Sequence, residues 1–192
     1  MTETVSLLLA LLTAASQVLL AGLGLLLAGS RASPQLNSMW VATRDALAPA
    51  SLWMAWTVAG VATAGSLYFS EAARYVPCEL CWYQRIAIYP MVVLLGVAAV
   101  KRDSRIAIYA APLAIAGAVI SAYHYQLQRL PSQASEFCDP TNPCSFTWVW
   151  EFHYISIPLM ALTAGILIAT LVTLARADSS EEHGEQLDAN QV

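Results

Sequence analysis

The stretch Tyr75–Arg85, YVPCELCWYQR, places two cysteines three positions apart directly before an apolar run, IAIYPMVVLLGVAAV, at Ile86–Val100. This run has 15 residues without a charged side chain, whereas a membrane-spanning helix needs about 20 residues to cross about 30 Å of hydrocarbon. The run reaches that length if the helix begins near Cys81 or Trp82. The stretch therefore predicts a transmembrane helix with the cysteines at its tip and Arg85 in its outer end.

The rest of the chain has the composition of a membrane protein. Of its 192 residues, 58% are hydrophobic and 11% are charged, against about 25% charged in soluble domains. In lipid, a helix satisfies its own backbone polar groups, so long uncharged runs are read as helices. Four further runs contain no charged residue: Val5–Ala28, Ala46–Ser70, Ile106–Leu127 and Ile155–Ala175. We therefore predict an all-α integral membrane protein, a four-helix transmembrane bundle with one additional N-terminal transmembrane helix.

Three regions follow from this pattern. Residues 1–45 hold the additional helix and a cytoplasmic loop, residues 46–176 form the four-helix core, and residues 177–192 form an acidic tail predicted to be disordered. The first run lacks a preceding basic segment and exceeds the apolar core of a secretory signal, about 7 to 15 residues. We expect this helix to be retained, although a cleaved signal is the alternative.

The basic residues predict the orientation, because Lys and Arg of short loops stay on the cytoplasmic side. With the N-terminus outside, six of the nine basic residues lie inside, and both cysteine pairs lie on the extracytoplasmic side. The turn KRDSR at Lys101–Arg105 supplies half of the six. Nine scattered basic residues give no nucleic-acid footprint, so no nucleic-acid partner is expected.

The first cysteine pair, Cys78 and Cys81, is suited to redox chemistry. Pro77 favours a helix start at this point, and the unpaired N–H groups of a helix N-terminus stabilise a thiolate, the reacting species in disulfide exchange. Residues three and four apart share a helix face, so Cys78, Cys81 and Arg85 form one stripe. Arg85 could stabilise the thiolate and polarise the oxygen of an electron acceptor; the alternative is an arginine that snorkels to the interface.

The second pair, Cys138 and Cys144, lies in the turn-forming sequence CDPTNPC. A loop this short restrains little unfolded-state entropy, so stabilisation is a weak reason for a disulfide here. An accessible disulfide can instead be attacked by a thiol of another protein. Structural disulfides in both pairs, or one zinc site made by all four cysteines, are the alternatives, although the five-residue gap fits zinc ligands poorly. No cysteine is expected on the cytoplasmic side, so a lipid quinone is the expected electron acceptor.

Four segments carry a family resemblance. Together they resemble the DsbB family of quinone-dependent membrane thiol oxidases, closest to its short-loop BdbC-type branch: CELCWYQR at Cys78–Arg85, YHYQLQ at Tyr123–Gln128, CDPTNPC at Cys138–Cys144 and FHYISIPLMAL at Phe152–Leu162. The resemblance implies a bacterial inner-membrane enzyme that reoxidises an extracytoplasmic thioredoxin-fold disulfide donor of the DsbA or BdbD kind. Its cofactor would be ubiquinone or menaquinone.

The resemblance also implies roles for individual residues. Cys81 would lie next to the quinone with Cys78 as its disulfide partner, and Arg85 and His124 would bind the quinone. Cys138 would accept attack from the reduced partner protein, and Cys144 would pass the exchange on to Cys78. A core or interfacial histidine is the alternative for His124, and no metal ligand is expected.

Other classes remain open from the sequence. Vitamin K epoxide reductase-like enzymes also couple cysteine pairs to quinone, but their loop pair precedes the C-x-x-C, whereas here Cys78 and Cys81 come first. A non-enzymatic membrane protein with structural disulfides or a metal site is a further alternative, as is an assembly subunit that uses small residues such as those of Gly22–Gly29 for packing. The aromatic residues around Trp148 and Trp150 predict an interfacial belt, with Glu151 and His153 solvated there.

Overall fold

The computed structural model describes residues 1–131, 138–139 and 141–189, with the backbone alone for 177–189. Within these ranges the chain forms six α-helices. A one-turn 3₁₀ helix precedes α3, a π-helical turn extends it, and another 3₁₀ turn precedes α5; the only strand-like pairing of the described residues is a bridge between Glu151 and Ile155. The helices are α1 (Thr2–Ser30), α2 (Pro34–Leu47), α3 (Ser51–Leu67), α4 (Glu79–Lys101), α5 (Ala107–Arg129) and α6 (Ile157–Ala189).

Five of the described segments are long and apolar enough to cross a membrane. They are Thr2–Ser30, Pro34–Ala72, Glu79–Lys101, Ser104–Arg129 and Ile157–Arg176. The predicted fold class is thus confirmed. The main difference is α2, which occupies the loop expected after the first helix: Ser33 is extended and Pro34 then starts the helix. α2 mixes polar and apolar residues and has no buried residue, so its sequence gave little indication of a helix.

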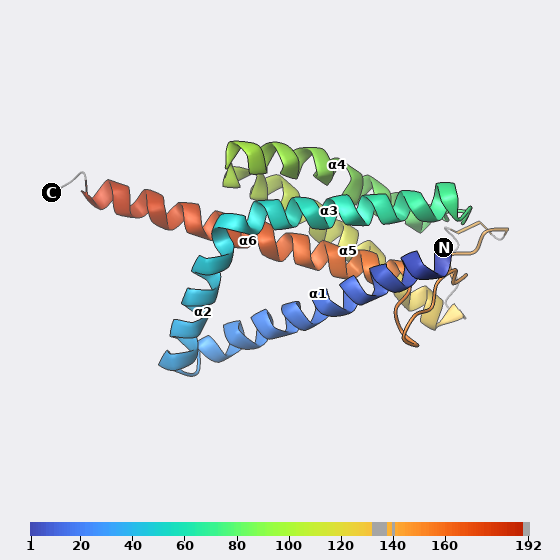
Figure 1. The fold of residues 1–192 in the computed structure, drawn as a ribbon, viewed down its shortest axis with the longest axis horizontal. Coiled ribbons are helices and arrows are strands. Elements are labelled where there is room, and N and C mark those ends of the chain that lie inside the picture. Colours follow the sequence, from blue (N-terminus) through green and yellow to red (C-terminus); the bar gives the residue numbers. More distant parts are fainter. Residues whose placement is uncertain (132–137, 140, 190–192) are drawn as a thin grey trace.

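The helix order places all reacting groups at one end of the bundle. The N-terminus, the connection from α3 to α4 and the connection from α5 to α6 lie together, while α2 lies at the other end (Figure 1). Arg102 follows the last residue of α4 and adopts the left-handed conformation, and Asp103 then caps the next turn by accepting a hydrogen bond from the Arg105 N–H. The tight turn KRDSR is therefore far from the cysteines.

α6 continues past Arg176, where the sequence analysis placed the start of a disordered tail. Its backbone is helical to Ala189. This segment contains good helix formers such as Glu, Gln and Ala, and extending an existing helix costs less than starting a new one. Residues 190–192 of the expected tail lie outside the described residues.

Small residues bring α4, α5 and α6 close together. A Cβ atom added at Gly165 of α6 would lie 3.0 Å from the Ala114 carbonyl oxygen and 3.2 Å from the Ala118 Cβ, both on α5. A Cβ added at Gly117 of α5 would lie 3.0 Å from the Ala87 Cβ on α4. Close approach of backbones is the usual basis of helix association in lipid, because lipid tails are as apolar as the side chains.

Substitution of Gly165 tests this packing. Gly165→Val should lower the free energy of unfolding by about 1–3 kcal/mol, because the added carbons meet the α5 backbone, which cannot move aside. Thermal unfolding of the detergent-purified protein measures the effect. Gly60→Val is the matched control, since nothing lies within 4 Å of a Cβ added there. Equal transition temperatures for the two variants would contradict the packing argument.

Candidate active site

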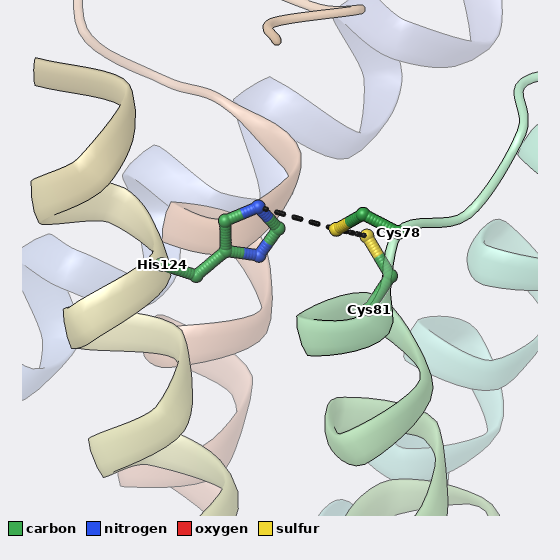
Figure 2. A group of neighbouring side chains, drawn as sticks. All are labelled: Cys78, Cys81 and His124. Atoms are coloured by element: carbon green, nitrogen blue, oxygen red, sulfur yellow. Dashed lines mark hydrogen bonds between the residues drawn. The ribbon is translucent and has the colours of Figure 1, made fainter. Parts of the chain in front are cut away.

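The first cysteine pair lies at the start of α4. Cys78 is the N-cap residue, with extended backbone after Pro77, and Cys81 lies in the first turn. Both are free thiols, and their Sγ atoms are 3.1 Å apart (Figure 2). Cys78 is buried, with 6% of its surface exposed, whereas Cys81 is half-buried. The pair can therefore close into a disulfide with little movement of the chain.

The second pair forms a disulfide, and its loop contacts the start of α4. Cys138 is bonded to Cys144, which is 2% exposed, whereas Cys138 is half-buried. The Asn142 side-chain amide donates a hydrogen bond of 3.1 Å to the Pro77 carbonyl, and the Asp139 N–H donates one of 3.4 Å to a Glu79 carboxylate oxygen. All four cysteines thus belong to one cluster with Leu80 and Leu127, with the more exposed sulfur of the disulfide at Cys138.

His124 of α5 lies between the two pairs. It is 2% exposed, and its Nε2 atom is 3.0 Å from the Cys144 carbonyl oxygen and 3.7 Å from the Cys78 Sγ atom (Figure 2). Its Nδ1 atom is 3.1 Å from the side-chain nitrogen of Gln84. A carbonyl can only accept and an amide nitrogen can only donate, so Nε2 carries the proton and Nδ1 accepts. His124 therefore links the loop disulfide to α4.

The environment of Cys78 favours its thiolate. The pKa of Cys78 is lowered to about 4, mainly by the hydrogen bond with the Cys81 thiol and also by the hydrogen bond with His124, although burial of the sulfur acts in the opposite direction. Cys78 precedes the membrane-spanning part of α4. In the reduced pair, Cys78 is thus the sulfur that carries the charge and Cys81 the one that donates the hydrogen bond.

A large apolar cavity lies on the other side of Cys81. Its volume is about 270 Å³, and it is lined by residues of α1, α3, α4 and α6 and by the segment before α4. Ligand pockets are commonly about 300–1,000 Å³, so this cavity suits a small ring whose substituents extend beyond it. Cys81 lines it, whereas Cys78 and His124 line a smaller neighbouring cavity. Its polar side chains on α3 and α4 are Thr57, Ser66, Cys81, Gln84, Arg85 and Tyr89.

Arg85 is held in this cavity by α3. Its Nε and Nη2 atoms donate hydrogen bonds of 3.1 Å and 3.2 Å to the hydroxyl and carbonyl oxygens of Ser66. The Tyr89 hydroxyl donates to the same Ser66 hydroxyl at 3.0 Å, and the guanidinium lies 5.0 Å from the ring centre of Trp82. The guanidinium is thus fixed beside Cys81 by contacts within the bundle.

Aromatic rings border the cavity near the cysteine end. The Tyr75 ring stacks between Phe69 at 5.7 Å and Trp148 at 4.7 Å, and all three residues line the cavity. The sequence predicted an interfacial belt for the segment around Trp148, and this residue also contacts the site.

Glu151 is half-buried and accepts a hydrogen bond of 2.8 Å from the Ser6 hydroxyl of α1.

The residues expected at the site are thus divided between two cavities. Cys81 and Arg85 face the larger cavity, and His124 lies against Cys78 and Cys144, away from it. Sequence reasoning missed two members of the site, Ser66 and Gln84. The sequence did indicate that Gln84 has a polar partner, because a polar residue next to Arg85 inside a membrane helix needs one. It did not indicate that this partner lies on α5.

The described residues do not form the four-cysteine metal site considered from the sequence, because Cys138 and Cys144 are bonded to each other. A smaller group could hold a metal ion: the side-chain donors of Cys78, Cys81 and His124 lie within 4.8 Å of one another. Zinc favours such sulfur and imidazole ligands. However, His124 would have to release the Nε2 proton that it donates to the Cys144 carbonyl.

A buried dithiol that contacts a loop disulfide at one end of a membrane helix bundle defines a membrane thiol–disulfide oxidoreductase. The chain belongs to the DsbB family, because the family model described as "Disulfide bond formation protein DsbB" matches residues 48–175. This assignment places it outside the non-enzymatic classes considered from the sequence. α1 and α2 precede the matched region.

Curated relatives agree with this assignment. The chain is 45% identical over 131 residues to "Disulfide bond formation protein C" of Bacillus subtilis, covering 68% of this chain and 95% of that protein. It is 47% identical over 121 residues to "Probable disulfide formation protein C 1" of Bacillus cereus, covering 62% and 86%, and 40% identical over 128 residues to "Probable disulfide formation protein" of Coxiella burnetii, covering 65% and 86%. No solved structure shows a significant match.

The low pKa of Cys78 can be measured in a Cys138→Ser/Cys144→Ser background, where only the first pair absorbs as thiolate. Ultraviolet thiolate absorbance of the reduced protein should titrate with a midpoint near pH 4. Cys81→Ala in this background should raise the midpoint toward the ordinary cysteine value of about 8.5, because the strongest stabilising hydrogen bond is lost. An unchanged midpoint would contradict the role assigned to that hydrogen bond.

Proposed function

We propose that this protein is a quinone-dependent thiol oxidase that reoxidises an extracytoplasmic thioredoxin-fold protein with a C-x-x-C site, of the DsbA or BdbD kind. The observation that carries the proposal is the apolar cavity in whose wall Cys81 lies next to Arg85. Lipid quinones combine an apolar ring with carbonyl oxygens that accept hydrogen bonds. An apolar cavity with one fixed guanidinium at its wall suits such a molecule.

The proposed reaction begins at the loop. A thiolate of the reduced partner attacks Cys138, the more exposed sulfur, and Cys144 leaves. The partner's second thiol then attacks its mixed disulfide with Cys138, so that the partner departs oxidised and the loop pair holds two electrons and two protons. Cys144 next attacks Cys78 of the oxidised first pair. Cys81 leaves as the thiolate, which the α4 N-terminus stabilises.

The reaction ends at the cavity. The second loop thiol, Cys138, re-forms the loop disulfide by attacking Cys144 and releasing Cys78. The first pair is then a dithiol, the state of Cys78 and Cys81 described above. A quinone held in the cavity by Arg85 would supply the acceptor for the two electrons and two protons of this dithiol. Arg85 would hold the acceptor oxygen beside Cys81, and the low pKa of Cys78 keeps this sulfur as the thiolate from which the Cys78–Cys81 bond forms while the pair loses two electrons and two protons to the acceptor.

His124 has a different proposed role from Arg85. Its hydrogen bond to the Cys144 carbonyl and its contact with Cys78 favour a residue that holds the two pairs in line for exchange. Gln84 connects His124 with the larger cavity, since it lies in the wall of that cavity and donates to the His124 Nδ1 atom. We therefore propose that His124 acts on the acceptor through Gln84.

We also propose that the cysteine end faces the extracytoplasmic side of a bacterial inner membrane. The cluster of Lys101, Arg102 and Arg105 lies at the opposite end of the bundle, the end expected in the cytoplasm. Disulfides persist on the extracytoplasmic side, where a secreted or anchored partner protein can reach Cys138.

Quinone reduction by the purified protein, with a reduced C-x-x-C partner as the electron source, tests the proposal. Cys81→Ser should abolish turnover, and Arg85→Gln should raise the KM for quinone by at least about tenfold, the loss of one charge-assisted hydrogen bond of about 1.5–3 kcal/mol. Arg129→Gln is the matched control, because Arg129 lies at the same end of the bundle over Trp150 and outside the cavity. Turnover by Cys81→Ser at the parental rate would refute the proposed function.

A further inference from the structure

The helix that precedes the family match forms part of the large cavity. Leu9, Leu12, Thr13 and Ser16, on two successive turns of α1, line the cavity together with groups of α3, α4 and α6. The family model begins at residue 48, so these positions lie outside it. α1 is therefore a feature of this chain that contacts the site used for the proposed function.

Polar contacts fix α1 against the bundle on both sides of this lining segment. On its N-terminal side, the Ser6 hydroxyl donates a hydrogen bond of 2.8 Å to the Glu151 carboxylate. On its C-terminal side, the Gln17 side-chain amide donates to the Thr163 hydroxyl of α6 at 3.2 Å and accepts from the Tyr154 hydroxyl at 3.1 Å. Hydrogen bonds between membrane helices hold them in one register.

Tight packing brings the same segment onto α3. A Cβ atom added at Gly65 would lie 2.9 Å from the Leu9 Cδ1 atom, so a larger residue there would displace the Leu9 side chain. Ala10 of α1 is fully buried, and Ser6 and Thr13 are buried as well. α1 thus packs closely at the cysteine end and is not a loosely attached anchor.

The lining segment of α1 and the α4 residues contribute different groups to the cavity. The Thr13 and Ser16 hydroxyls donate to carbonyl oxygens of α1 itself, both at 2.8 Å, so their hydrogens are engaged within the helix. A quinone carbonyl, which only accepts, therefore finds its charged donor in the Arg85 guanidinium of α4. Leu9 and Leu12 add apolar surface. This arrangement suits an apolar ring that lies against α1 and presents one oxygen to Arg85.

We infer that α1 is a wall of the acceptor-binding site and closes the cavity between α3 and α6 toward the lipid. This inference rests on the proposed quinone-dependent function, and it assigns Leu12, Thr13 and Ser16 as positioning and specificity residues for the lipid quinone. They contact the face or substituents of the ring while Arg85 holds one of its oxygens.

A bulky residue at Leu12 tests the inference in the full-length protein. Leu12→Trp should raise the KM for a short-chain quinone by about tenfold, equivalent to about 1.4 kcal/mol, because the larger side chain occupies the site. Leu11→Trp is the matched control: Leu11 is 50% exposed and Leu12 is 54% exposed, but Leu11 does not line the cavity. Oxidation of the reduced partner by the loop disulfide without quinone should be equally fast in both variants.

The outcomes separate the inference from the proposed function. If the parent protein reduces no quinone, the proposed function fails. If the parent is active and Leu12→Trp has the same KM as Leu11→Trp, the inference about α1 is overturned. Photolabelling of the parent with an azido-quinone is a second test that needs no substitution: the label should appear on a peptide from residues 2–30, and labelling confined to α3, α4 and α6 would also overturn the inference.

Discussion

The position at which α4 begins determines the geometry of the whole site. Pro77 and the extended Cys78 start the helix, so Cys81 falls on the first turn and Arg85 one turn deeper. Unpaired N–H groups at this helix start favour a thiolate. The loop of the second pair is fastened to the same point, through Asn142 to the Pro77 carbonyl. A shift of this helix start by one residue would turn the cysteines away from both cavities.

Cys81 is the only cysteine that lines both described cavities. It therefore lies between the other thiol groups of the site and the larger apolar cavity. On one side, Cys78 and Cys144 belong to one buried cluster, and His124 contacts both residues. On the other side lies an apolar cavity with Arg85 held by Ser66. In the proposed reaction, this single side chain connects the thiol exchange with the acceptor site, so that electrons would need no further carrier inside the protein.

The sequence predicted the fold because membrane helices follow directly from uncharged runs of sufficient length. The bounds of α1, α4 and α5 agree within a few residues, whereas the run predicted for α3 also covers the short helical turns at both its ends and α6 continues beyond its predicted run to Ala189. The sequence also brought Cys81 and Arg85 onto one helix face, because helical spacing fixes that relation. Contacts between helices were out of reach: Ser66 with Arg85, and Gln84 with His124, depend on how α3, α4 and α5 pack. The contribution of α1 was hidden for the same reason, since nothing in an apolar run indicates which neighbour it contacts.

In the proposed function, the first cysteine pair delivers electrons directly to a quinone. A single-turnover measurement tests this step alone: the Cys138→Ser/Cys144→Ser protein is reduced, freed of reductant and mixed anaerobically with one equivalent of quinone. One quinone should be reduced for each Cys78–Cys81 disulfide formed, without any partner protein. Thiols that stay reduced while the quinone stays oxidised would contradict it.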